Sequence, residues 1–360
     1  SRGLNGAVVI TTKSGKGFKG FGVSVSQTFG IDHAYRTPDI QTEYGVGVMP
    51  GWKDTDNNGS VWDPFQFKLD DKGDRTLIGS YGWGPKYDGQ PIRNYDGTWT
   101  NYSPHKDNML DLYQLGLNSN TNVAIRGGND KTSYYTSLSY KKARSTSEKN
   151  TFERYSFLLK GSHKISDRVE VSAAMSFTNS NPKNSPRMVG ERFVNPNGTI
   201  MTPMLDVNYF RDKYLGEHGG LASTSYGDKY GSVPGRDLFF MIDKYDYSQK
   251  ETVVRPQMEV NVQILDWLRF KADANMNYYY TKFEEKQLGS GYANEGGKYT
   301  MGQTTKEQAT FGGTFTVNKQ IKDFSVGGFA RYEYYTSRSG AYKVYTDGGM
   351  VVPGQWFVDN

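Results

Sequence analysis

Apolar and polar residues alternate one by one along much of the chain. In residues 267–280, for example, Leu268 and Phe270 alternate with Arg269 and Lys271. A period of two puts the two sets on opposite faces of a β-strand. Unpaired charges are costly to bury, so the charged face must meet water and cannot form the core of a soluble sandwich.

The same alternation recurs in nine segments. Each is about nine or more residues long, which is the length that a tilted strand needs to cross the hydrocarbon layer of a membrane. Pro256 would normally argue against a central strand, but the alternation continues on both sides of it. We therefore predict nine barrel strands, in residues 21–29, 117–126, 133–141, 154–165, 168–177, 252–265, 267–280, 308–319 and 324–335.

The connections between these segments are alternately short and long. The short ones fall at residues 127–130, 166–167, 265–266 and 320–323. The others are long or variable and span residues 30–113, 142–151, 180–250 and 284–306, with a tail from residue 336. Short periplasmic turns and long extracellular loops are typical of outer-membrane barrels. The sequence therefore predicts an all-β fold, a transmembrane antiparallel β-barrel with long extracellular loops.

The composition narrows the class of protein further. Mean hydropathy is −0.71 although 14% of the residues are aromatic, a combination expected when lumen-facing polar residues offset lipid-facing apolar ones. No run of about 18 apolar residues exists, which excludes a helical membrane span. The absence of cysteine excludes disulfides and thiol-ligated zinc. The net charge of +5 is spread evenly and gives little reason to expect nucleic acid as a partner.

A soluble all-β sandwich or propeller is the alternative fold, because such proteins also alternate and turn often. The charged second faces and the asymmetry of the connections argue against it. Aromatic residues also gather near predicted strand ends, at residues 278–280 and 332–335, as in the interfacial girdle of a membrane barrel.

Several stretches resemble a known family. Residues 1–16, SRGLNGAVVITTKSGK, resemble the end of the plug domain in SusC/RagA-like TonB-dependent outer-membrane transporters. Further similar segments follow in order, and this order is more specific than any one of them: residues 41–47, 81–92, 126–140 and 162–180. The resemblance implies that residues 1–18 are the C-terminal end of the plug and its linker. Residues 19–360 would be the N-terminal part of the barrel.

The sequence departs from a whole family member in several ways. It has no signal peptide, no TonB box and almost none of the plug. Nine strands would leave two open sheet edges in lipid, which is not viable. Plugged barrels of this class have about 22 strands. We therefore expect the 360 residues to be a middle piece of a longer chain.

The sequence carries no enzyme motif. It contains no G-x-S-x-G, no C-x-x-C and no H-E-x-x-H, and the opening glycines and lysines do not form a phosphate-binding loop. The four histidines are scattered, and the alternation places His163 on the lipid side near a short turn. We therefore predict that the protein is not an enzyme.

A calcium site is one hypothesis for the first long loop. Residues 54–63, DTDNNGSVWD, resemble the start of a calcium loop, whose oxygens converge around a glycine turn. The twelfth position of a full EF-hand would be Glu, and here it is Phe65. An Asx-rich turn needs the same residues for backbone reasons and is the alternative. The candidate ligands are Asp54, Asp56, Asn58 and Asp63.

The same loop is rich in aromatic residues beside polar groups. Flat aromatic faces stack on sugar rings, so the loop could bind a glycan or a lid protein, while packing within the loop is the structural alternative. The candidate ligand-binding residues are Trp52, Tyr81, Trp83, Tyr87, Tyr95 and Trp99.

The resemblance implies active import of a large nutrient across the outer membrane of a Bacteroidetes-type bacterium. An oligosaccharide is the first candidate substrate; a peptide importer of the same architecture, or a surface adhesin or structural barrel without transport, are alternatives. The implied partners are a SusD-like surface lipoprotein, TonB with its inner-membrane motor, and outer-membrane lipid. The predicted lumen wall, facing the plug or the transport path, consists of Arg255, Glu259, Arg269, Lys271, Asp273, Arg331 and Glu333.

Overall fold

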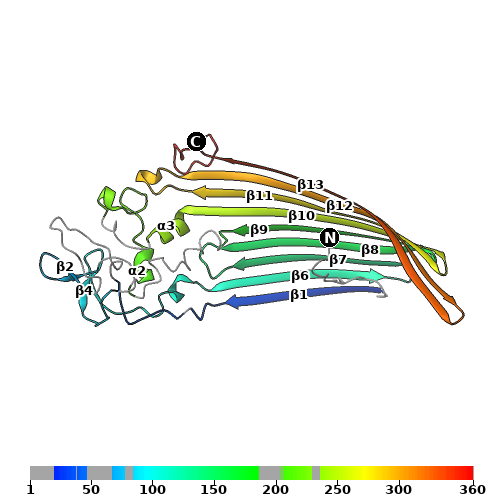
Figure 1. Ribbon diagram of the computed structural model, residues 1–360, viewed down its shortest axis with the longest axis horizontal. Coiled ribbons are helices and arrows are strands. Elements are labelled where there is room, and N and C mark those ends of the chain that lie inside the picture. The colour runs from blue at the N-terminus through cyan, green and yellow to red at the C-terminus, as the bar shows by residue number, and fades with distance from the viewer. Residues whose placement is uncertain are drawn as a thin grey trace.

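The computed structural model describes residues 20–37, 39–46, 67–77, 84–185, 204, 206–228 and 236–359. These residues form one large antiparallel sheet in which each strand pairs with the next along the chain (Figure 1). The nine predicted segments are its nine strands, which confirms the all-β prediction. In sheet order they are β1 (Gly20–Asp32), β6 (Gly116–Gly128), β7 (Thr132–Arg144), β8 (Thr151–Ser166), β9 (Val169–Lys183), β10 (Tyr245–Leu265), β11 (Leu268–Gln287), β12 (Lys298–Ile321) and β13 (Phe324–Tyr345).

Short turns gather at one end of the sheet and long connections at the other, as the sequence predicts. The turns that join β6 to β7, β8 to β9, β10 to β11 and β12 to β13 lie at the right of Figure 1. At the other end, the segments after β1 and β9 build a body of loops beyond the strands. We call this body the loop cap.

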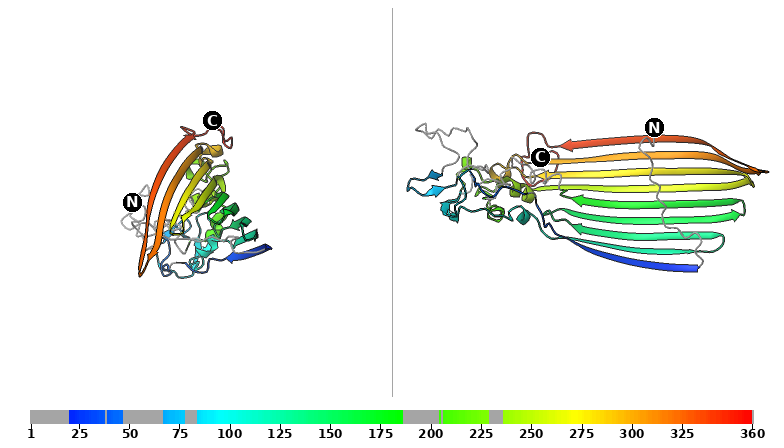
Figure 2. Two further views of the ribbon diagram at one scale, coloured as in Figure 1. Left: turned by 90° about the vertical axis from the view of Figure 1, so that its right-hand side faces the viewer. Right: turned by 60° about the horizontal axis from the view of Figure 1, so that its bottom comes forward.

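The sheet is curved (Figure 2), and side-chain exposure together with register indicates that its polar face is the inner one. Two neighbouring tyrosines on β7 show this, because Tyr135 is 8% exposed and Tyr134 is 39% exposed. Register places Tyr134 in one row with Gly161 and Met258, and Tyr135 in one row with Lys160. Side chains on the inside of a curved sheet crowd together, so the apolar row of Tyr134 and Met258 lies on the outer, convex face.

Pro256 lies within β10, in the middle of the sheet. On one side it pairs in register with Met175 of β9. On the other side the register with β11 passes from Val254 directly to Gln257, so the ladder is interrupted at the proline. A proline cannot donate a ladder hydrogen bond, and here the sheet tolerates a local gap on one side only.

The loop cap contains a small sheet and short helices. The small sheet has the order β2–β3–β4–β5. No helix in the described part of the chain is long and apolar enough to cross a membrane. The elements at this end are β2 (Lys68–Leu69), β3 (Arg75–Thr76), β4 (Pro91–Arg93), β5 (Trp99–Asn101), η1 (Leu110–Leu112), α2 (Val207–Arg211), η3 (Thr224–Tyr226), α3 (Arg236–Lys244) and η4 (Tyr292–Asn294).

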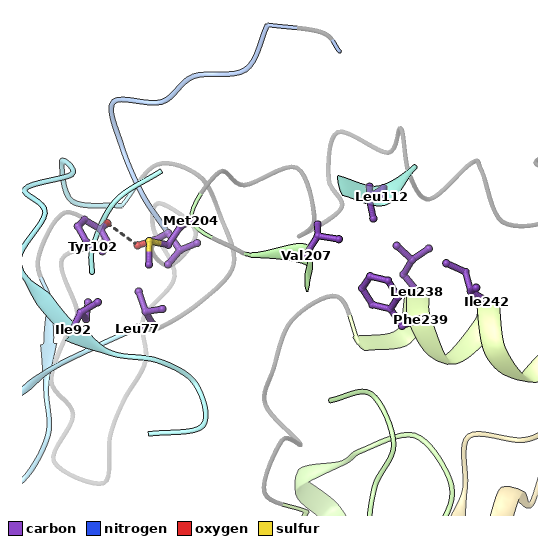
Figure 3. Close-up of a cluster of buried hydrophobic side chains, with 10 residues drawn as sticks. Leu77, Ile92, Tyr102, Leu112, Met204, Val207, Leu238, Phe239 and Ile242 are labelled. Atoms are coloured by element: carbon purple, nitrogen blue, oxygen red, sulfur yellow. Dashed lines mark hydrogen bonds between the residues drawn. The ribbon is translucent and has the colours of Figure 1, made fainter. Parts of the chain in front are cut away.

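One hydrophobic core joins two loops that are distant in sequence (Figure 3). The loop between β1 and β6 contributes Ile92 and Tyr102, and the loop between β9 and β10 contributes Val207 and Leu238, all fully buried or nearly so. The buried side chain of Asn108 reinforces the junction by accepting a hydrogen bond from the Val207 amide at 2.7 Å. The two loops therefore pack as one unit. Residues 1–18, the predicted plug end, lie outside the described residues.

Candidate functional site

A bidentate ion pair crosses the concave face of the sheet. Arg331 on β13 donates from both terminal nitrogens to the two carboxylate oxygens of Asp273 on β11, at 2.7 and 2.9 Å. It also donates to Thr314 Oγ1 on β12 at 2.9 Å and pairs with Glu333 at 3.1 Å. Such fork-shaped pairs fix geometry more strongly than single contacts do. Gly312 on β12 makes room for this pair, because a methyl group there would collide with the guanidinium.

A second group of charges continues the first along the same face. Lys271 Nζ on β11 lies 3.2 Å from Glu259 Oε2 on β10 and 4.0 Å from Asp273 Oδ1. The other oxygen of Glu259 accepts a hydrogen bond from Asn261 at 2.6 Å. We call this row from β10 to β13 the wall string, consisting of Asn261, Glu259, Lys271, Asp273, Arg331 and Glu333. Its charges largely neutralise one another.

The remaining predicted wall residues stand apart from the wall string. Arg255 lies with its guanidinium carbon 5.6 Å from the ring centroid of Tyr279. Arg269 donates to the Gln263 side chain at 3.2 Å. Among the described residues, neither arginine forms an ion pair with a carboxylate. Both share the concave face with the string, as the alternation predicts, but they are not part of one network.

A polar hollow of about 460 Å³ lies beside the wall string. Small side chains on β7, β8 and β9 form its floor, and Ser133 Oγ lies 2.8 Å from Ser162 Oγ there. Its walls carry both signs of charge, with Lys160 on β8 and Glu170 on β9 opposite the string. A surface of hydroxyls and balanced charges can accept hydrogen bonds from, and donate them to, a polar chain of either kind, peptide or sugar.

The structure separates the predicted aromatic ligand-binding residues. Tyr87 packs against the core of the loop cap, with its ring centroid 5.0 Å from that of Tyr102, and Tyr95 packs against the same core. Burial raises the pKa of both Tyr87 and Tyr95 above the ordinary value. Trp99 is different, because 53% of it is exposed. Trp52, Tyr81 and Trp83 lie outside the described residues, as do the candidate calcium ligands Asp54, Asp56, Asn58 and Asp63.

Trp99 is held as a flat exposed platform. The guanidinium carbon of Arg93 lies 4.4 Å from the centroid of its ring. Asp74 in turn accepts a hydrogen bond from Arg93 at 2.7 Å, and Oδ2 of Asp70 lies 3.3 Å from Nε of Arg93. The aspartates fix the arginine, and the arginine backs one face of the indole through a cation–π contact. The ring therefore keeps its orientation while much of its surface meets solvent.

Sequence reasoning missed a buried contact between a histidine and an aspartate in the loop cap. His218 Nδ1 lies 3.0 Å from Asp228 Oδ2, and both side chains are almost fully buried. The rings of Tyr226 and Tyr292 flank the imidazole, with centroids 4.5 and 5.8 Å away. No motif marks these residues, since their environment is created by two loops that meet only in the folded chain. The described residues contain no cluster of three or more groups suited to a metal ion.

Asp228 organises the loop around this contact. Its carboxylate accepts hydrogen bonds from the amides of Glu217 at 2.9 Å and Ser223 at 3.0 Å. Burial opposes ionisation, but these amides and the imidazole of His218 outweigh it and hold the pKa of Asp228 below its ordinary value. The loop is also hydrogen-bonded to the segment between β11 and β12, because the Ala293 amide donates to the His218 carbonyl at 2.9 Å. The two loops are thereby fastened together.

Comparison with known proteins reveals likeness in structure. No family model matches the chain, and no curated protein matches it. A chain of the RagAB peptide importer in its closed-closed state superposes with a TM-score of 0.64 at 17% identity, over 93% of this chain and 36% of that one. The open-open state superposes with a TM-score of 0.63 at 16% identity, over 97% of this chain and 37% of the matched chain. A further RagAB peptide transporter structure superposes with a TM-score of 0.50 at 18% identity, over 70% of this chain and 28% of the matched chain.

These matches bear out the resemblance to SusC/RagA-like transporters at the level of the fold. The likeness to the closed-closed and open-open states extends over nearly the whole of this chain, although few residues are identical. This chain spans only about a third of the length of the chains it matches.

Proposed function

We propose that the chain is part of the barrel wall of a TonB-dependent outer-membrane transporter that imports a large nutrient. The observation that carries this proposal is the nine-strand sheet itself. It has an exposed apolar convex face, a charged concave face, short turns at one end and long loops at the other. This combination is typical of outer-membrane barrels. The likeness in fold to an importer supports the same function.

Each surface of the sheet would face a different environment. The convex face contacts outer-membrane lipid, the short turns lie in the periplasm, and the loop cap is extracellular. Both outer strands, β1 and β13, would need further strands as neighbours, because open edges are not viable in lipid. We assign residues 1–18 to the end of the plug and its linker, and the rest of the chain to one portion of a larger barrel.

The partners follow from the energetics of import. A ligand shifts an equilibrium only by its differential affinity for two states, so binding alone cannot accumulate a nutrient. TonB and its inner-membrane motor would supply the work through the plug. A SusD-like lipoprotein would cover the loop cap. The wall string, whose charges are already paired, would offer the plug or the passing substrate a polar surface without a strong net charge.

An oligosaccharide is the first substrate that we propose. Trp99 supports it, because a fixed and exposed indole is suited to stacking on a sugar ring. A peptide is the second candidate, and the specific observation in its favour is that the structural neighbours are a peptide importer. The calcium site at Asp54, Asp56, Asn58 and Asp63 stays a prediction.

Uptake by cells tests the proposal. Cells with and without the gene for the whole transporter would be offered labelled oligosaccharides and labelled peptides, with and without a protonophore. We expect gene-dependent uptake of one class that stops when the protonophore is added. Trp99→Ala should lower uptake of a sugar, while Tyr35→Ala, which removes an aromatic that is 83% exposed in the same loop, should not. Gene-dependent adhesion without any uptake would contradict the proposal.

A further inference from the structure

The convex face of the sheet has a hollow of about 700 Å³ lined almost wholly by apolar groups. It covers two neighbouring register rows of this face. One row crosses from β7 to β12 with Tyr134 and Phe311 at its two ends, and the other includes Leu159 and Met276. Between them, Gly161 on β8, Ala173 on β9 and Ala274 on β11 have no long side chain, whereas Met258 on β10, which is 54% exposed, protrudes between Ala173 and Ala274. The hollow therefore arises where small residues interrupt a surface of protruding side chains.

We propose that this hollow holds an acyl chain of a membrane phospholipid. The inference rests on the membrane placement in the proposed function, and it goes beyond transport. Filling an apolar concavity on a lipid-facing surface with hydrocarbon is favourable, because the atoms that line a gap lose their dispersion contacts. A flexible chain can enter the space between Tyr134 and Phe311.

The shape of the site argues against a second copy of this chain as the occupant. The outer face of a barrel is convex, so two such walls contact each other only over a narrow strip. Protein interfaces need close complementarity over a broad area. An extended hydrocarbon chain needs only a narrow space, which the small residues leave on either side of Met258.

On β7 and β8 the hollow lies close to the short turns, because Tyr134 is two residues from the start of β7 and Gly161 is five residues from the end of β8. Two positions beyond Gly161 on the same face, His163 hydrogen-bonds Thr132 with 2.8 Å between Nδ1 and Oγ1. Exposed Lys131 and Arg168 lie in the adjoining turns, where a phosphate headgroup at the membrane surface would meet basic side chains. Asp130 and Asp167 occupy the same turns, so the net charge of these turns is small. The contact with the acyl chain, and not the contact with the headgroup, therefore supplies most of the binding. The site therefore belongs to the periplasmic leaflet.

Filling the hollow tests the proposal. A Cβ at Gly161 would have only the Ser133 carbonyl within 4 Å, at 3.8 Å, so Gly161→Leu can fold and occupy the space. Gly328→Leu on β13 is the matched control, since register puts Gly328 opposite Val317 on the same convex face, outside the hollow and with nothing within 4 Å. Both variants would be made in the whole transporter and purified from outer membranes.

Native mass spectrometry would then count the phospholipids that stay bound to the protein as the collision energy in the instrument is raised. We expect Gly161→Leu to lose the phospholipid that survives the highest activation in the wild type, and Gly328→Leu to keep it. Equal retention in all three proteins would overturn the proposal. A change of oligomeric mass in Gly161→Leu with unchanged lipid would also overturn it and would identify a protein interface. Lipid retention is measured without substrate, so a barrel that imports nothing would still show the difference.

Discussion

The carboxylate of Asp273 on β11 accepts two hydrogen bonds from Arg331 on β13, at 2.7 and 2.9 Å, across the intervening strand β12. The contact passes over Gly312, which has no side chain to block it. It is the central link of the wall string and ties three strands together by their side chains.

Gly312→Ala should displace the Arg331 guanidinium and lower the stability of the barrel. A methyl group at Gly312 would collide with that guanidinium, so the bidentate geometry cannot persist. Thermal unfolding in detergent, followed by circular dichroism, measures the effect. Gly328→Ala provides the control, because a Cβ there has open space. Equal melting temperatures for the two variants would show that the Arg331 position is not constrained by Gly312.

A double-mutant cycle on Asp273→Asn and Arg331→Gln should reveal favourable coupling between the two residues. Each single change removes one charge of the pair and leaves the partner with only its remaining charged contact, Glu333 for Arg331 or Lys271 for Asp273, whereas the double change removes both charges. The pair is partly exposed to water, so the coupling should weaken as salt is added. Denaturant unfolding of the four proteins at low and high salt checks both points. Strictly additive effects would contradict the structure.

Nine strands could be predicted from the sequence because alternation survives in a sheet with one polar and one apolar face. Their ends were predicted less well. The sequence indicated a strand in residues 308–319, whereas β12 runs from Lys298 to Ile321. In residues 302–307, GQTTKE, polar and small residues occupy both faces, so the alternation is interrupted and does not mark the extension. Beyond the hydrocarbon layer a strand has no need of an apolar face, and the pattern that reveals it fades.

The loop cap could not be predicted for a different reason. Tyr102 and Leu238 share one core, but they are more than a hundred residues apart, and nothing local in either segment specifies the contact. The small strands β2 to β5 have only two or three residues each, too few to show a period. Aromatic composition suggested a ligand surface, while the folded loop places Tyr87 and Tyr95 against its own core. Trp99 alone among the described candidates is mostly exposed.

Tyr102→Ala should loosen the loop cap without unfolding the sheet. The side chain is fully buried, and its hydroxyl donates to the Pro85 carbonyl at 2.9 Å. Removing a buried large aromatic costs about 3–5 kcal/mol. Limited proteolysis should therefore cut residues 84–113 much faster in the variant. Trp99→Ala, which removes an exposed ring, should be cut at the wild-type rate. Equal rates for Tyr102→Ala and the wild type would contradict the assigned core.

The contact between the two loops at Asp228 should weaken in acid. The pKa of Asp228 is lowered from its ordinary value of 3.8, so the folded state favours the ionised form. This stability is fully present above the ordinary value and is lost as pH falls through the lowered value. Hydrogen exchange at the amides of Leu221 and Ala293, which bond across the junction, should accelerate in that window beyond the ordinary effect of pH on exchange.

Asp228→Asn supplies the control for the acid effect. The substituted side chain does not titrate, so the additional pH dependence should disappear while the two loops exchange faster at neutral pH. An unchanged pH profile in this variant would mean that another group governs the junction.

Cysteine scanning of β10 tests the central claim, that this sheet is the wall of a membrane barrel, most directly. The chain contains no cysteine, so each introduced thiol is the sole one in this segment. Single cysteines would replace Gln257, Met258, Glu259, Val260 and Asn261 in outer membranes, followed by labelling with a water-soluble maleimide. We predict strict alternation, with labelling at 257, 259 and 261 and protection at 258 and 260. Equal labelling of both faces would contradict the account, because it would mean that water, and not lipid, covers the convex side.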